Sequence, residues 1–177
     1  MNLIVWTLIT GTAGTLAALG TALWALPTPH LYIVTVGAVG CVLAPVQGLL
    51  LPPQLAHERR AWMFYGLIGA LGGTVVLWGA DWYLDDIIGG VGFGAVVGLM
   101  GWSIIRDTIP VAWPWVIANM FGYAFVSGIV LLTKSVNRLY RAYESAAPLW
   151  LLALLFGVAA FVYALISGTV MRRLARQ

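Results

Sequence analysis

Carboxylates are the first residues of this chain whose type and spacing suggest chemistry. Asp81, Asp85 and Asp86 fall within six residues and make up half of the six acidic residues in a chain of 177. Asp81 and Asp85 lie one helical turn apart, so together they could share a proton or hold a cation. The alternative, which is the commoner one, is a solvated acidic turn without a ligand.

Three further side chains are candidates for contact with a small molecule or pigment. Asn119 and Gln47 lie inside apolar stretches, where an amide is costly unless it is paired. An interhelical hydrogen bond is the simpler role for both. His30 follows LPTP and could ligate the metal of a tetrapyrrole, whereas a solvated loop histidine is the more common case.

The sequence contains no recognisable catalytic or metal-binding motif. His30 and His57 are expected on opposite sides of the membrane, and Cys41 is remote from both, so no shared zinc site is predicted. Neither a G-x-S-x-G nor an H-E-x-x-H motif occurs. The sequence therefore predicts no catalytic residue and no metal ligand.

Composition indicates the class of protein to which these residues belong. Hydrophobic residues make up 62% of the chain and charged residues 8%, whereas about a quarter of the residues of a soluble protein are charged. The nine lysines and arginines lie between apolar runs and do not form a phosphate-binding face, so nucleic acid is excluded as a partner. We expect an all-α polytopic integral membrane protein with a single domain over residues 1–177.

Charged and turn residues divide the chain into apolar runs that are each long enough to span a bilayer. The first run has no basic segment before it and is too long for a signal peptide, so we expect it to stay as a helix. The arrangement predicted is six transmembrane helices forming three tandem hairpins. The runs lie near residues 3–26, 31–51, 61–80, 87–105, 112–133 and 147–171.

The distribution of positive charge predicts the orientation. Six arginines fall on the side of the termini, against three basic residues on the other side, and cytoplasmic loops are the ones enriched in Lys and Arg. Both termini are therefore expected in the cytoplasm of a bacterium, with the acidic turn outside. The nine tryptophans fall near the ends of the runs and are expected to form interfacial belts: Trp6, Trp62, Trp102, Trp113 and Trp115 inside, and Trp24, Trp78, Trp82 and Trp150 outside.

Small residues at a spacing of four mark the expected helix contacts, since helices in lipid associate by close packing. We expect most of them to pack within the protein, although one such ladder could face a partner subunit. The ladders are Gly40, Ala44 and Gly48; Gly69 and Gly73; and Gly90, Gly94 and Gly98.

Residues 134–145 form a basic amphipathic segment. Val136, Leu139, Tyr140 and Tyr143 recur at helical spacing, and Lys134, Arg138 and Arg141 cluster on the opposite face. The pattern predicts a surface helix on the outer leaflet that docks on anionic lipids or an acidic partner. The alternative is a solvated extension of the fifth span.

Two parts of the chain are similar to each other. The stretch from Gly40 aligns with that from Gly94 at an offset of 54, and the stretch from Trp62 aligns with that from Trp115 at an offset of 53. The units predicted are residues 40–93 and 94–147, with partial copies at both ends.

These residues carry a resemblance to a family. The chain resembles repeat-built six-span bacterial membrane proteins of uncharacterised function, which are common in phototrophic bacteria. The resemblance covers residues 37–128 and 156–177, in the stretches GAVVGL, QGLLLPPQ, GWSIIRDTIP, AWPW and VYALISGTVMRRLARQ. It departs at LPPQ, where the family has an LRRQ-like end. It implies an architecture and no catalytic residues.

Two functions of different classes follow as expectations. We favour a non-enzymatic accessory or scaffold subunit that packs against lipids and other membrane subunits. Given the resemblance, the complex would be a photosynthetic or electron-transfer assembly. The alternative is a protein that binds or transports a small solute, since the substrate components of energy-coupling vitamin transporters are similar in size. The sequence requires no cofactor, and it is compatible with a bound lipid or pigment.

Overall fold

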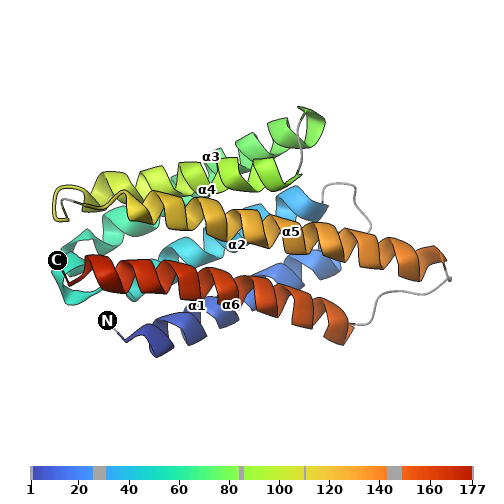
Figure 1. Cartoon of the computed structure of the whole chain (residues 1–177), viewed down its shortest axis with the longest axis horizontal. Helices are drawn as coiled ribbons and strands as arrows, with labels where there is room; N and C mark the ends of the chain where they lie inside the picture. Colours follow the sequence, from blue (N-terminus) through green and yellow to red (C-terminus); the bar gives the residue numbers. More distant parts are fainter. Residues whose placement is uncertain (1, 26–30, 84–85, 110, 143–148, 177) are drawn as a thin grey trace.

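The computed structural model is an all-helical protein, described over residues 2–25, 31–83, 86–109, 111–142 and 149–176 (Figure 1). These described residues form six α-helices and one short 3₁₀ helix, which follow one another in chain order. They are α1 (Leu3–Ala25), α2 (Leu31–Leu49), η1 (Pro53–Glu58), α3 (Arg59–Tyr83), α4 (Asp86–Ile105), α5 (Pro114–Ala142) and α6 (Leu149–Leu174). The predicted all-α fold is therefore confirmed.

Five of the helices are long and apolar enough to cross a membrane. The stretches that meet this criterion are Leu3–Thr21, Pro53–Gly79, Ile87–Ile105, Pro114–Tyr140 and Trp150–Leu174. The second helix offers a shorter apolar stretch, Ile33–Leu49. Six helices thus occur where six apolar runs were expected, and the length and apolar character of five of them make this a membrane-embedded protein.

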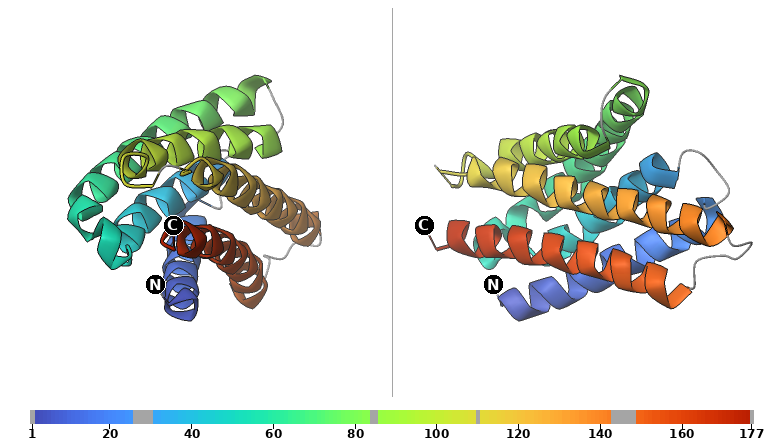
Figure 2. Two further views of the ribbon diagram at one scale, coloured as in Figure 1. Left: turned by 60° about the vertical axis from the view of Figure 1, so that its left-hand side comes forward. Right: turned by 45° about the vertical axis from the view of Figure 1, so that its right-hand side comes forward.

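The helices close into a ring. Each helix packs against the next in chain order, and α6 returns against α1. Figure 2 shows this closure from two directions, with α1 beside α6 and α4 beside α5. A few contacts between α2 and α5 cross the interior. The three hairpins expected from the sequence are therefore joined into one bundle.

Apolar side chains cover the outside of this bundle as well as fill its interior. Phe121, Val75 and Ile4 are each 68% exposed, a fraction that is favourable where the solvent is lipid. Inside, one cluster centres on Phe93, Tyr123 and Phe156. A second cluster, which we call the tryptophan cluster, lies nearer the chain termini. It contains Trp6, Leu51, Leu55, Trp62, Ile104, Ile105, Ile109, Ala112, Trp115, Met171 and Leu174.

The expectation that the tryptophans lie at the membrane interface is wrong for three members of the tryptophan cluster. Trp6, Trp62 and Trp115 were expected at the membrane interface, yet each is at most 3% exposed. The rings of Trp62 and Trp115 touch, with their centroids 5.2 Å apart. These three indoles fill the interior near the end that holds the chain termini, whereas Trp113 at 60% exposure lies outside. Trp62 and Trp115 are also aligned by the sequence repeat, which itself stays a prediction.

The small-residue ladders lie at contacts between helices. On α4, a Cβ added to Gly94 would collide with the backbone of Asn119, and one added to Gly98 would lie 2.8 Å from the Cα of Val116. The backbones of α4 and α5 therefore touch without intervening side chains. The other ladder residues are also buried against neighbouring helices: Gly90 on Ser127, Gly40 and Gly73 on Phe93, Gly48 on Met63, Gly69 on Val97, and Ala44 facing Gly66.

Both chain termini lie at one end of the bundle, as Figure 1 shows. The connection from α2 to α3 and the connection from α4 to α5 lie at this same end. Six arginines, all exposed, mark it: Arg59, Arg60, Arg106, Arg172, Arg173 and Arg176. The structure thus gathers the charges that the sequence assigned to one side.

The contact between α4 and α5 predicts how two substitutions on α4 will differ. Gly94→Leu should destabilise the protein by about 1–3 kcal/mol or more, because the side chain would force two backbones apart. Leu99→Ala should have a much smaller effect, since Leu99 is 50% exposed on the outer surface. The fraction of folded protein recovered in detergent would measure both. Equal recovery of Gly94→Leu and the parent would show that the backbones do not touch there.

Candidate functional site

A buried polar network inside the bundle, toward the end that holds the chain termini, is the candidate site. The hydroxyl of Tyr163 on α6 donates a hydrogen bond to Oδ1 of Asn119 on α5 at 2.9 Å. Nε2 of Gln47 on α2 donates to the same hydroxyl oxygen at 3.4 Å. None of the three residues is more than 4% exposed. The network therefore links three helices that are far apart in the sequence.

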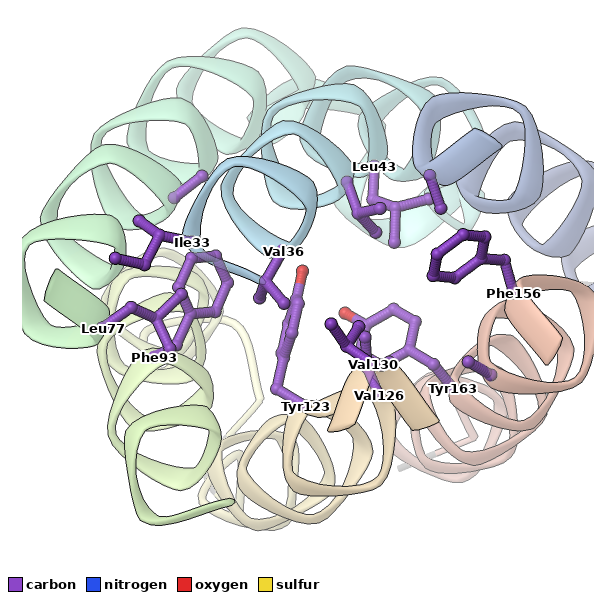
Figure 3. Close-up of a cluster of buried hydrophobic side chains, with 14 of the residues drawn as sticks. Ile33, Val36, Leu43, Leu77, Phe93, Tyr123, Val126, Val130, Phe156 and Tyr163 are labelled. Atoms are coloured by element: carbon purple, nitrogen blue, oxygen red, sulfur yellow. The ribbon is translucent and has the colours of Figure 1, made fainter. Parts of the chain in front are cut away.

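A second tyrosine packs beside the network. The ring of Tyr123 on α5 lies against the ring of Tyr163, with their centroids 4.9 Å apart. Figure 3 shows both hydroxyl groups directed into the space that the helices enclose. On its other side, the ring of Tyr123 contacts Phe93 of α4 at 4.5 Å. A row of three aromatic rings thus crosses the bundle from α4 to α6.

Local sequence explains how each group reaches the centre. Asn119 is held by its own helix, because its Nδ2 donates to the carbonyl oxygen of Trp115 one turn earlier at 2.8 Å. This leaves Oδ1 to accept the bond from Tyr163. Gly122 has no side chain, and the ring of Tyr163 rests on it, since an added Cβ would lie 2.5 Å from Cδ2 of that ring.

Beside the network lies a small cavity. It offers a volume of about 20 Å³ to the centre of a water molecule and is lined from α2, α3, α4, α5 and α6. Its polar lining comes from Gln47, Tyr123, Tyr163 and the indoles of Trp62 and Trp115. The groups of this site form hydrogen bonds but carry no formal charge. The arrangement suits a small neutral molecule and offers no charged group for acid or base chemistry.

The structure brings together two of the three residues expected to contact a ligand. Asn119 and Gln47 meet at the hydroxyl of Tyr163, so the simpler role considered for them, an interhelical hydrogen bond, is present. His30 lies outside the described residues. Sequence reasoning missed Tyr163, Tyr123 and Trp115. The available signal was polar atoms in the middle of apolar runs, as in FVYALIS around Tyr163.

The acidic cluster stays a prediction. Asp81 falls in the last turn of α3 and Asp86 begins α4. Asp85 and the side chains of the other two aspartates lie outside the part of the chain that the structure describes. Among the described residues, no group of three or more His, Cys, Asp or Glu side chains forms a metal-binding cluster.

The expectation for the basic segment is also wrong. A separate surface helix was expected over residues 134–145, but α5 continues unbroken to Ala142. No glycine or proline lies between Ile129 and Ala142 to interrupt it. Val136 and Tyr140 pack against the core, whereas Leu139 is 64% exposed. The segment is thus the alternative considered, an extension of the fifth helix. Tyr143 and the side chain of Arg141 lie outside the described residues.

Comparison with protein-family models, with curated proteins and with solved structures finds no match to this chain. The family resemblance seen in the sequence therefore stays a prediction.

Two glycines of α5 provide a test of the network. Gly122→Ala should push the ring of Tyr163 away from Asn119 and destabilise the protein by about 1–3 kcal/mol. Gly128→Ala, six residues later on the same helix, meets no atom within 4 Å and should be neutral or stabilising, since alanine favours helix. Unfolding in mixed detergent would measure both. If the two variants unfold alike, Gly122 does not position Tyr163.

Proposed function

We propose that the protein is a non-enzymatic structural subunit of a larger membrane assembly, docked through the projecting end of α5. The observation that carries this proposal is the length of α5. Its 29 residues span about 43 Å, against about 30 Å for the hydrocarbon core of a bilayer. In Figure 1 the last turns of α5 project beyond the ends of the neighbouring helices.

Charge and exposure indicate what the projecting end would bind. Lys134 and Arg138 lie in the last three turns of α5, and Arg138 is exposed. Leu139 beside it is 64% exposed, although it lies beyond the span of a hydrocarbon core that starts near Pro114. An exposed cation next to an exposed apolar side chain suits an acidic surface on a neighbouring membrane subunit. The resemblance in the sequence would make that assembly photosynthetic or electron-transferring.

The interior of the bundle supports a structural role over solute transport. Large side chains fill the centre, where Phe93, Tyr123, Phe156 and Tyr163 are each at most 2% exposed. The central cavity has about 20 Å³, close to the size of one water molecule. Binding of a small solute remains the second candidate, favoured by the polar lining from Gln47 and Tyr163. It would require the helices to separate.

The proposed orientation places both termini in the cytoplasm of a bacterial cell. Six exposed arginines at the end that holds the termini support this, because cytoplasmic loops are rich in Lys and Arg. The projecting end of α5 would then lie outside, as would the turn between α3 and α4.

Cysteine labelling tests the orientation. With Cys41 changed to Ala, Asp85→Cys should react with a membrane-impermeant maleimide in intact cells. Arg176→Cys should react only after the membrane is opened. The reverse pattern would place the termini outside.

Charge reversal tests the proposed function. Arg138→Glu should reduce recovery of partner chains with the purified protein several-fold, and high salt should do the same for the parent, since exposed charges are screened within about 8 Å. Arg176→Glu reverses one exposed arginine at the opposite end and should leave recovery unchanged.

Two results would contradict docking through α5. Recovery that is unaffected by Arg138→Glu and by salt would show that this end binds no acidic partner. If Arg138→Glu weakens binding to anionic vesicles and leaves the recovery of partner chains unchanged, the projecting end binds lipid headgroups and not a protein partner.

A further inference from the structure

The indole of Trp115 presents a buried donor that the rest of the network does not use. The side chain is 1% exposed, and among the described protein groups its Nε1 has no hydrogen-bond partner. A buried donor without a partner costs about 1–3 kcal/mol, and a side chain that is 1% exposed cannot reach solvent to relieve that cost. Something inside the bundle is expected to accept this bond.

Trp115 lines the central cavity, and the helix opposite makes room for it there. Gly101 of α4 also lines the cavity, and a Cβ added to Gly101 would collide with Nε1 of Trp115. Only a residue without a side chain lets the indole N–H approach α4 this closely. The position of Nε1 therefore depends on the same absence of side chains that brings α4 against α5.

The cavity has the size and the partners that one water molecule needs. A buried water requires about 10–15 Å³ of such volume and two to four polar partners, and this cavity offers about 20 Å³. Beside Trp115, the polar residues Gln47, Tyr123 and Tyr163 line it, and Figure 3 shows both tyrosine hydroxyls directed into the space that the helices enclose. The bond from Gln47 to Tyr163 is long, at 3.4 Å, so both groups have capacity for a second partner.

We propose that this cavity is a binding site for a single water molecule, which accepts a hydrogen bond from Nε1 of Trp115 and is also held by Gln47. The polar lining is neutral, so it would not compensate a cation for the loss of its hydration in the membrane interior. The volume is too small for an organic solute. The water would connect Trp115 to the network of Gln47, Tyr163 and Asn119 and bring a fourth polar side chain into it.

Nuclear magnetic resonance of the full chain in lipid nanodiscs tests this site. With ¹⁵N-labelled indoles, the Hε1 proton of Trp115 should show a direct cross-peak to a long-lived water at short mixing times. Trp6 is the matched control, because it is equally buried at 1% exposure but donates its Nε1–H to Ser167 at 3.3 Å. Its Hε1 should show no such cross-peak. Trp115→Phe and Trp6→Phe assign the two signals.

A conservative variant distinguishes the role of Gln47. Gln47→Met keeps the side-chain volume and removes the amide, so the water cross-peak of Trp115 should be lost or strongly reduced while the other indole signals keep their positions. A cross-peak that persists unchanged would overturn the assignment of Gln47 as the second partner. No cross-peak at Trp115 in the parent, or equal cross-peaks at Trp115 and Trp6, would overturn the site itself.

Discussion

A single hydroxyl group, that of Tyr163, joins three helices of this bundle. It donates to Asn119 on α5 and accepts from Gln47 on α2, while its own ring belongs to α6. Inside a bilayer these groups have no external solvent to hydrogen-bond, so each must find its partner within the protein. Apolar contact alone gives little drive for association in lipid. This shared hydroxyl therefore selects which helices meet across the interior.

Close contact between helix backbones is the second requirement of this bundle, and the hydrogen bonds of the Tyr163 hydroxyl make it necessary. The hydroxyls of Tyr123 and Tyr163 can reach the centre only if the helices around them lie close together. Gly94 and Gly98 let α4 rest on the backbone of α5, and Gly122 gives space to the ring of Tyr163. A bundle packed in this way has a filled interior, which supports the proposed structural role over a path for solutes.

Sequence patterns predicted the elements well, because each depends on local composition. The apolar runs correspond to helices, and Gly94 was placed at a helix contact by its spacing from Gly90 and Gly98 alone. Asn119 and Gln47 were selected because amides are rare in apolar runs. Their common partner was not predicted, since Tyr163 lies 44 residues from Asn119 and 116 from Gln47. No local pattern specifies which helices face each other over such distances.

The two errors have a common physical origin. Tryptophan near the end of a span was assigned to the membrane interface, yet Trp6, Trp62 and Trp115 turn inward and seal the bundle. The basic segment was assigned to the membrane surface, yet it continues α5 outward. In both cases the local pattern is compatible with more than one position in the fold, and tertiary packing decides between them. Such packing is not encoded in the local sequence.

A double-mutant cycle between Tyr163 and Asn119 tests the central claim most directly. The free energy of unfolding would be measured in mixed detergent for the parent, Tyr163→Phe, Asn119→Ala and the double variant. If the hydroxyl joins α6 to α5 in the membrane, the two substitutions should be coupled by about 0.6 kcal/mol, and by at most about 1.7 kcal/mol. Strictly additive effects would contradict the account, because the two side chains would then contribute to stability independently.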